Sequence, residues 1–137
     1  MTSEHFPVKD PEEFLEPRSL SAALAKGMRC KCPSCGETKL FTSGLKVQDK
    51  CDVCHEEFHH HRADDLPAYL NIFIVGHIMV ALTIVVMDMK IFGLWQLVAL
   101  STVATVSVAF LLMRPLKGMV VAAQWALRMH GFGGNDD

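Results

Sequence analysis

Charged residues are almost absent from residues 67–113, where Asp88 and Lys90 are the two that occur. Residues 1–66, by contrast, hold nine of the 13 Lys and Arg and twelve of the 15 Asp and Glu. The elements of a soluble domain alternate polar and apolar residues, and the long uncharged region offers no polar face to water. This segregation argues against a soluble bundle and indicates that the two regions lie in different solvents.

A secretory signal and a catalytic set of residues are also missing. The opening residues lack the basic, apolar and small-residue segments of a signal, so we expect the amino end to stay where the protein is made. Residues 1–26 are polar and acidic and contain Pro7, Pro11 and Pro17, which predicts a mobile tail. No nucleophile–base set stands out, so the sequence predicts a protein that is not an enzyme.

Two apolar runs are long enough to be transmembrane helices. Residues 67–87 have three clearly polar members, and as a helix they would measure about 31 Å against a hydrocarbon core of about 30 Å. Residues 93–113 form a second run, whose hydroxyl side chains can bond within the helix or across to a neighbour. The link DMKIF is short, so residues 63–113 are predicted to form a hairpin of two transmembrane helices.

Basic residues predict how this hairpin is oriented. Arg62 precedes the first run, Arg114 and Lys117 follow the second, and the hairpin tip offers only Lys90. Because positive charge resists translocation, both termini are predicted to be cytoplasmic. The lipid bilayer is therefore the first expected partner.

The region after the second run, residues 114–137, is predicted to hold an interfacial helix and a carboxyl-terminal tail. Pro115 should end or bend the span, because it removes a backbone donor. Residues 119–129 are apolar except for Gln124 and Arg128, and this narrow polar stripe suits a helix lying in the headgroup layer. A helix docked against the cytosolic domain is the alternative, and the sequence does not separate the two.

Two Cys-x2-Cys pairs, CPSCG and CDVC, stand fifteen residues apart and comprise Cys32, Cys35, Cys51 and Cys54. Two intervening residues let both thiolates of a pair reach one ion, and Gly36 permits the φ > 0 turn that directs amides at sulfur. With a short hairpin of strands at 39–41 and 45–47, residues 27–62 are predicted to form a zinc ribbon, a small β module. Because about 35 residues bury little core, binding of the ion would also stabilise the fold.

Other interpretations of these cysteines are weaker. A reducing compartment disfavours disulfides, and the presence of two matched pairs disfavours a single redox motif. Iron would accept the same ligands, and the spacing alone does not choose the metal, although Zn²⁺ is the favoured ion. Cys30 is expected to be an ordinary unliganded cysteine, since four ligands already close a structural site. An alternate ligand or a site of palmitoylation or oxidation is the alternative.

Histidines and aspartates crowd the segment between the second cysteine pair and the first span. His55 is expected to be a turn residue at a position where such a module often has Gly, and a metal ligand is the alternative. A possible second metal site or membrane-interface cluster contains His59, His61, Asp64 and Asp65. Capping of the first span and contact with headgroups are the favoured interpretation, because the positive end of the helix dipole lies there. A metal site built on His61 and the two aspartates is the alternative.

His77 lies about 15 Å into the first span, near the bilayer midplane. It is expected to bond a hydroxyl of Ser101, Thr102 or Thr105 on the second span. An intramembrane role stays open, since polar groups are costly at this depth. The alternatives are ligation of haem or copper and contact with a span of a partner protein.

The motifs CPSCG, LFTSGLKV, Cys-x2-Cys, HRADDLPAY, IFIVGH and LLMRPLKGMVVAAQWALRMHGF occur in this order over about residues 25–132. Together they resemble a small bacterial membrane family called domain of unknown function 983. His55, and Leu66 where the family often has Gly, depart slightly from its pattern. The resemblance implies a location in the bacterial inner (plasma) membrane. Genes of this family often lie beside those for haem-copper cytochrome c oxidase and its assembly factors, which implies a role in biogenesis of that complex.

The sequence therefore predicts a membrane-anchored zinc-ribbon protein that assists or assembles a complex of other membrane proteins. The alternative is a metal or redox handling protein that uses the cluster at 59–65 or His77. Binding of nucleic acid is disfavoured, because acidic residues of the ribbon roughly cancel its lysines and no aromatic stacking platform is evident.

Overall fold

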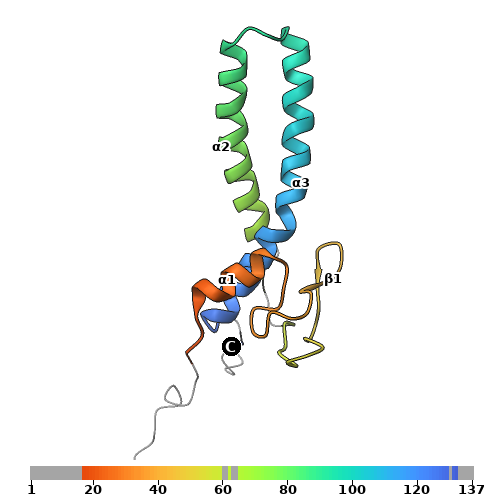
Figure 1. Cartoon of the computed structure of the whole chain (residues 1–137), viewed down its shortest axis with the longest axis vertical. Helices are drawn as coiled ribbons and strands as arrows, with labels where there is room; N and C mark the ends of the chain where they lie inside the picture. The colour runs from red at the N-terminus through yellow and green to blue at the C-terminus, as the bar shows by residue number, and fades with distance from the viewer. Residues whose placement is uncertain (1–16, 60–61, 63–64, 130, 133–137) are drawn as a thin grey trace, which may run out of the picture.

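The computed structural model describes residues 17–59, 62, 65–129 and 131–132. Three helices and a two-stranded sheet follow one another along the chain as α1 (Leu20–Met28), β1 (Phe41–Ser43), β2 (Lys46–Val47), α2 (Leu66–Asp88) and α3 (Leu94–Ala126). Figure 1 shows α2 and α3 side by side as a long hairpin, with α1 and the sheet gathered at its open end. The molecule thus has a helical shaft and a small body at the base of the shaft.

The shaft confirms the two predicted apolar helices. Residues of α2 that recur every four positions are buried toward α3, namely Pro67, Asn71, Val75 and Met79. The Asn71 side chain donates a 2.8 Å hydrogen bond from Nδ2 to the backbone carbonyl of Ala109, which joins the two helices across their interface. One face of α2 therefore packs against α3, and most of its other side chains are exposed.

Both helices are long and apolar enough to cross a membrane. In their most apolar windows only 17% of α2 and 6% of α3 is buried. The core helix of a soluble protein would be mostly covered, whereas here side chains such as Ile72 and Phe110 are 72% and 83% exposed. Apolar surface on this scale fits a hydrocarbon solvent.

The carboxyl-terminal part of α3 corrects the prediction of a separate interfacial helix. α3 is continuous from Leu94 to Ala126, with Pro115 inside it. Figure 1 shows the helix changing direction in its lower, blue part and continuing beneath α1. A proline removes one helical hydrogen bond, which bends a helix without necessarily ending it. The supposed polar stripe also faces inward, because Gln124 is only 6% exposed.

The amino-terminal side needs a second correction, because α1 lies in a region assigned partly to the predicted tail at 1–26. Ser19 caps α1 by accepting a hydrogen bond from the Ala22 amide. Close packing follows where Gly27 of α1 meets Gly118 of α3, since a Cβ on either glycine would collide with the other's backbone. The composition of this segment did not predict the helix, because α1 is stabilised by contacts with residues of α3 about ninety positions away.

One apolar core joins the parts of the body. Its members come from α1 (Ala23), from the cysteine-bearing segment (Leu40, Phe41, Val47 and Phe58) and from α3 (Val120, Val121, Ala122 and Trp125). Val121 and Ala122 are completely buried. The end of α3 therefore serves as the central element of the body.

Candidate metal centre

A short β-hairpin separates the two cysteine pairs. β1 and β2 are antiparallel, with Phe41 opposite Val47 and Ser43 opposite Lys46. Gly44 makes the turn with φ +52°, a backbone region that favours glycine. The strands lie close to the predicted ranges 39–41 and 45–47, with the first displaced by two residues. The inward side chains of Phe41 and Val47 belong to the same apolar core as residues of α3, which links the hairpin to the base of the shaft.

The structure brings the four predicted ligands together, since the sulfur atoms of Cys32, Cys35, Cys51 and Cys54 all lie within 4.8 Å of one another. Across the two pairs, the Cys32 and Cys54 sulfurs are 3.7 Å apart. The Cys35 and Cys51 sulfurs are 3.8 Å apart. Tetrahedral zinc–sulfur bonds of about 2.3 Å would place sulfurs about 3.8 Å apart. The four side chains therefore fit a tetrahedral metal ion.

The loops after each pair share a backbone geometry. Gly36 follows the first pair with φ +79°, and His55 follows the second with φ +61°. Positive φ is easy for glycine and uncommon for histidine. His55 nevertheless adopts it, and it therefore occupies a turn position, as predicted. These turns direct backbone amides at the sulfurs of the two pairs.

Those amides favour the thiolate form that binds metal. Burial opposes ionisation of Cys51, but hydrogen bonds from the Thr38 hydroxyl and from the amides of Cys54 and Val53 outweigh it and lower its pKa to about 6. Thr38 Oγ1 lies 3.0 Å from the Cys51 sulfur.

The pKa values of the two cysteines of the first pair shift in opposite directions. Burial also opposes ionisation of Cys35, but amides of Glu37 and Thr38 lower its pKa. Burial raises the pKa of Cys32 well above its usual range, despite amides from its own loop. A cation among the sulfurs would offset that cost, because it favours the charged form.

Positive charge also reaches the first cysteine pair from α1. Lys26 Nζ donates hydrogen bonds to the carbonyl oxygens of Ser34 at 2.6 Å and Pro33 at 3.4 Å. Four thiolates around Zn²⁺ carry a net charge of about −2, which a nearby ammonium group stabilises. Sequence reasoning placed Lys26 in the tail and missed this contact, whose one local signal is the helix-favouring run SAALAK.

The fifth cysteine stands apart from the four. All five thiols are free of disulfides, but Cys30 is not a member of the four-sulfur cluster. It has φ +57° and packs against the apolar core. This placement agrees with the expectation of an unliganded cysteine.

The proposed second cluster is described only in part, because His61 and Asp64 lie outside the described residues. His59 Nδ1 lies 3.7 Å from Glu57 Oε2. Asp65 occupies the N-cap position of α2, and its carbonyl accepts from the Tyr69 amide. Its side chain makes no capping hydrogen bond, which corrects the expectation of a side-chain cap at this residue. The backbone of Asp65 is helical, whereas a capping side chain normally requires an extended backbone.

His77 differs from its predicted environment. The expected partners, Ser101, Thr102 and Thr105, donate to carbonyls of their own helix. His77 lies on the outer surface of α2, and its Nδ1 is 2.7 Å from the carbonyl of Phe73. Val75 and Met79 of α2 face α3. His77 is two residues from each of them, and two residues turn a helix by about 200°, so His77 points to the opposite side.

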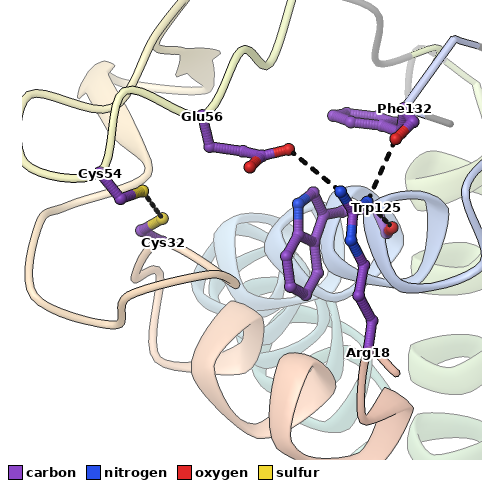
Figure 2. Close-up of polar contacts among 6 residues, drawn as sticks. All are labelled: Arg18, Cys32, Cys54, Glu56, Trp125 and Phe132. Carbon is purple, nitrogen blue, oxygen red and sulfur yellow. Dashed lines mark hydrogen bonds and ion pairs between the residues drawn. The ribbon is translucent and has the colours of Figure 1, made fainter. Parts of the chain in front are cut away.

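Arg18 is the most connected residue that sequence reasoning missed. Its Nη1 donates to the carbonyls of Trp125 at 2.8 Å and Phe132 at 3.2 Å. Its Nη2 lies 3.6 Å from Glu56, and the guanidinium is 4.4 Å from the centre of the Trp125 ring. Figure 2 shows this side chain running along the tryptophan toward Glu56, beside the segment that carries Cys32 and Cys54. A cation here also suits the negative end of the α3 dipole.

Fold and site together define a helical-hairpin protein with a four-cysteine module at the open end of its hairpin. A family model described as "Protein of unknown function (DUF983)" matches residues 41–125, and the chain belongs to this family. The predicted resemblance is thereby confirmed over α2, most of α3 and the second cysteine pair. The first pair precedes the matched range and rests on the geometry of this chain. No curated protein and no solved structure matches the chain.

Proposed function

We propose that this protein is a non-enzymatic accessory or assembly factor of a membrane complex, with a zinc ribbon held at the cytoplasmic surface by a two-helix membrane anchor. The observation that carries the proposal is the shared core of ribbon, α1 and α3. A ribbon on a flexible tether would search a large volume, whereas a ribbon packed on its anchor is presented at one height and orientation. Such preorganisation lowers the entropic cost of binding a partner in the same membrane.

The connection between ribbon and α2 supports the same conclusion. The buried Gln124 side chain accepts a 3.1 Å hydrogen bond from the Arg62 amide and donates a 2.9 Å bond to the Arg62 carbonyl. Both polar groups of the linker residue are thus bound to α3. On the other side, the Arg114 guanidinium lies 5.7 Å from the Phe41 ring centre, which is within cation–π range. These contacts fix the ribbon and the linker residue Arg62 to α3 of the anchor.

Zinc is the metal we propose for the four-cysteine site. Four thiolates with no open position suit a structural Zn²⁺ ion, which supplies folding energy and no redox chemistry. Iron would accept the same ligands, so the identity of the metal is part of the test. We place the protein in the bacterial inner membrane with both termini in the cytoplasm. Cytochrome c oxidase is the partner that the family resemblance implies.

The test is co-purification of the tagged full-length chain in mild detergent, followed by mass spectrometry and metal analysis. We expect subunits of one membrane complex to be recovered with the parent protein and with a Cys30→Ser control. A Cys51→Ser variant, compared at equal amounts in the membrane, should lose them together with its zinc. If the complex is cytochrome c oxidase, membranes lacking the protein should also contain less assembled oxidase.

Two outcomes would contradict the proposal. Recovery of the chain alone under conditions that preserve other membrane complexes would argue against an accessory role. Equal recovery of the partner with Cys51→Ser would show that the ribbon does not take part. Bound haem or copper that is lost on changing His77 would favour the alternative of metal or redox handling.

A further inference from the structure

His77 is the central residue of α2, the twelfth of its 23 residues. It therefore lies about 16 Å along the axis from either end of the helix, at the middle of a bilayer that α2 would span. Its side chain is exposed on the surface that faces away from α3. A polar ring at this depth and on this face would be in contact with hydrocarbon unless another molecule covers it.

The hydrogen bond to Phe73 determines what the other ring nitrogen can do. A backbone carbonyl only accepts, so Nδ1, 2.7 Å from the Phe73 oxygen, carries the proton. In the neutral ring Nε2 is then an acceptor with a lone pair. Within the described part of the chain, His77 has no second polar partner. An unpaired acceptor in an apolar medium is unfavourable, so a donor is expected from outside the chain.

The surface around His77 has a shape that could accommodate a helix. An open groove of about 830 Å³ runs along it. We define the His77 face by residues that line this groove, Leu66, Tyr69, Phe73, His77, Val80 and Ile84. They recur at intervals of three and four, the pattern of a helix–helix interface. Gly76 lies beside His77, and a Cβ built there would meet nothing within 4 Å. Glycine costs about 1 kcal/mol inside a helix, and among the described residues no close contact requires it at position 76.

A second copy of this chain is a poor occupant of the His77 face. In a two-fold dimer packed through this face, each His77 would meet the other at the same depth, and two acceptors cannot bond. Hydroxyl groups of α3 near that depth are already committed to carbonyls of their own helix, namely those of Ser101, Thr102, Thr105 and Ser107. Among the described residues, α3 of a second copy therefore offers no spare hydroxyl donor at the depth of His77.

We propose that Nε2 of His77 accepts a hydrogen bond from a donor group on a transmembrane helix of a different protein, and that this helix packs along the His77 face. The inference rests on the proposed membrane location and specifies how the accessory protein holds its partner. The partner's helix would carry a hydroxyl, amide or indole N–H near the bilayer midplane. The groove supplies apolar packing, and the single hydrogen bond selects the register.

The experiment is site-specific photo-crosslinking in living cells. A benzoylphenylalanine placed at Phe73, on the His77 face, is expected to give one discrete adduct with another membrane protein. The same probe at Phe110, another exposed aromatic but on α3, is the positional control and should not give that adduct. Each probe is combined with His77, His77→Gln and His77→Leu in chains present at equal levels.

The dependence on residue 77 tests the chemistry. Glutamine keeps an acceptor oxygen, so the yield of the adduct should stay within about two-fold of the parent yield. Leucine keeps only the bulk of the side chain, so the yield should fall about five-fold, as expected for the loss of one hydrogen bond. Equal yields in both variants would overturn the proposal, as would an adduct between two copies or crosslinks to lipid alone. Carbonate extraction of the same membranes separates the two proposals. A chain released by carbonate refutes the membrane location itself, whereas a retained chain without the adduct refutes only the role of His77.

Discussion

At the scale of single residues, the metal centre depends on four cysteines, and no other described residue joins their cluster. The cross-pair sulfur distances of 3.7 and 3.8 Å match those expected around one tetrahedral ion, so each sulfur is needed as a ligand. Serine at one ligand would replace a soft thiolate by a neutral hydroxyl, which is a poor ligand for zinc.

We therefore expect Cys35→Ser or Cys51→Ser to lose bound metal and unfold the ribbon, while the parent protein holds one Zn²⁺ per chain. The binding energy of a structural zinc, about 10–16 kcal/mol in zinc-finger peptides, exceeds what so small a module can supply from its core. Metal analysis and protease resistance of the purified protein measure the two effects. Cys30→Ser is the matched control and should keep its zinc. Freshly isolated parent protein without zinc or iron would refute the site.

Asp65→Asn tests the second cluster. Because the Asp65 side chain makes no capping bond, only a favourable charge near the helix amino terminus is lost. Such a charge is worth about 0.3–1 kcal/mol, so stability should change little. The metal content should stay at one ion per chain. A second equivalent of metal in the parent protein that disappears in Asp65→Asn would establish a further site instead.

Residue-scale reasoning was strongest where the chemistry is local. The positive φ at Gly36 and the turn at His55 follow from the Cys-x2-Cys spacing itself. Arg18 was missed because the carbonyls that it binds lie more than 100 residues along the chain. Lys26 was missed because the residues of α1 were assigned to the tail. The hydroxyl partner of His77 was assigned wrongly, since helix length gives depth but does not give rotation about the axis.

At the scale of elements, the contact between α1 and α3 depends on the absence of two side chains. Gly27 and Gly118 meet backbone to backbone, and Ala122 lines the same contact. Close approach of helices requires such small residues, as in other tightly packed pairs.

Gly118→Ala should therefore destabilise the body by about 1–3 kcal/mol, because the added methyl group meets the Gly27 carbonyl and the helices must separate. Gly76→Ala is a matched control on α2, where the methyl group meets open space and helix propensity should give up to about 1 kcal/mol. Thermal unfolding and the temperature of zinc release, measured in detergent, compare the two. Equal effects of both substitutions would show that α1 does not dock as described.

At the scale of the whole molecule, all the charge-rich structure that is described lies at the open end of the hairpin, and Lys90 stands at its tip with φ +54°. The distribution of basic residues predicts that the tip faces the outside.

A cysteine placed at Lys90 should accordingly react with a membrane-impermeant maleimide in intact cells. A cysteine at Ser21, exposed on α1, should react only after the cells are permeabilised. The parent protein is the background control, because its own thiols lie in the body. Labelling at Ser21 in intact cells would reverse the proposed orientation.

The sequence by itself determined the two apolar helices and the pairing of cysteines, because the length of an apolar run and the spacing of a Cys-x2-Cys pair are properties of adjacent residues. It also identified the family, through motifs that keep their order along the chain. Only the tertiary structure decided that α3 runs through Pro115 into the core, that α1 docks on Gly118, and that His77 faces outward. Each of these depends on which surfaces meet, and the free energy of such contacts comes from residues far apart in sequence, where local pattern carries no information.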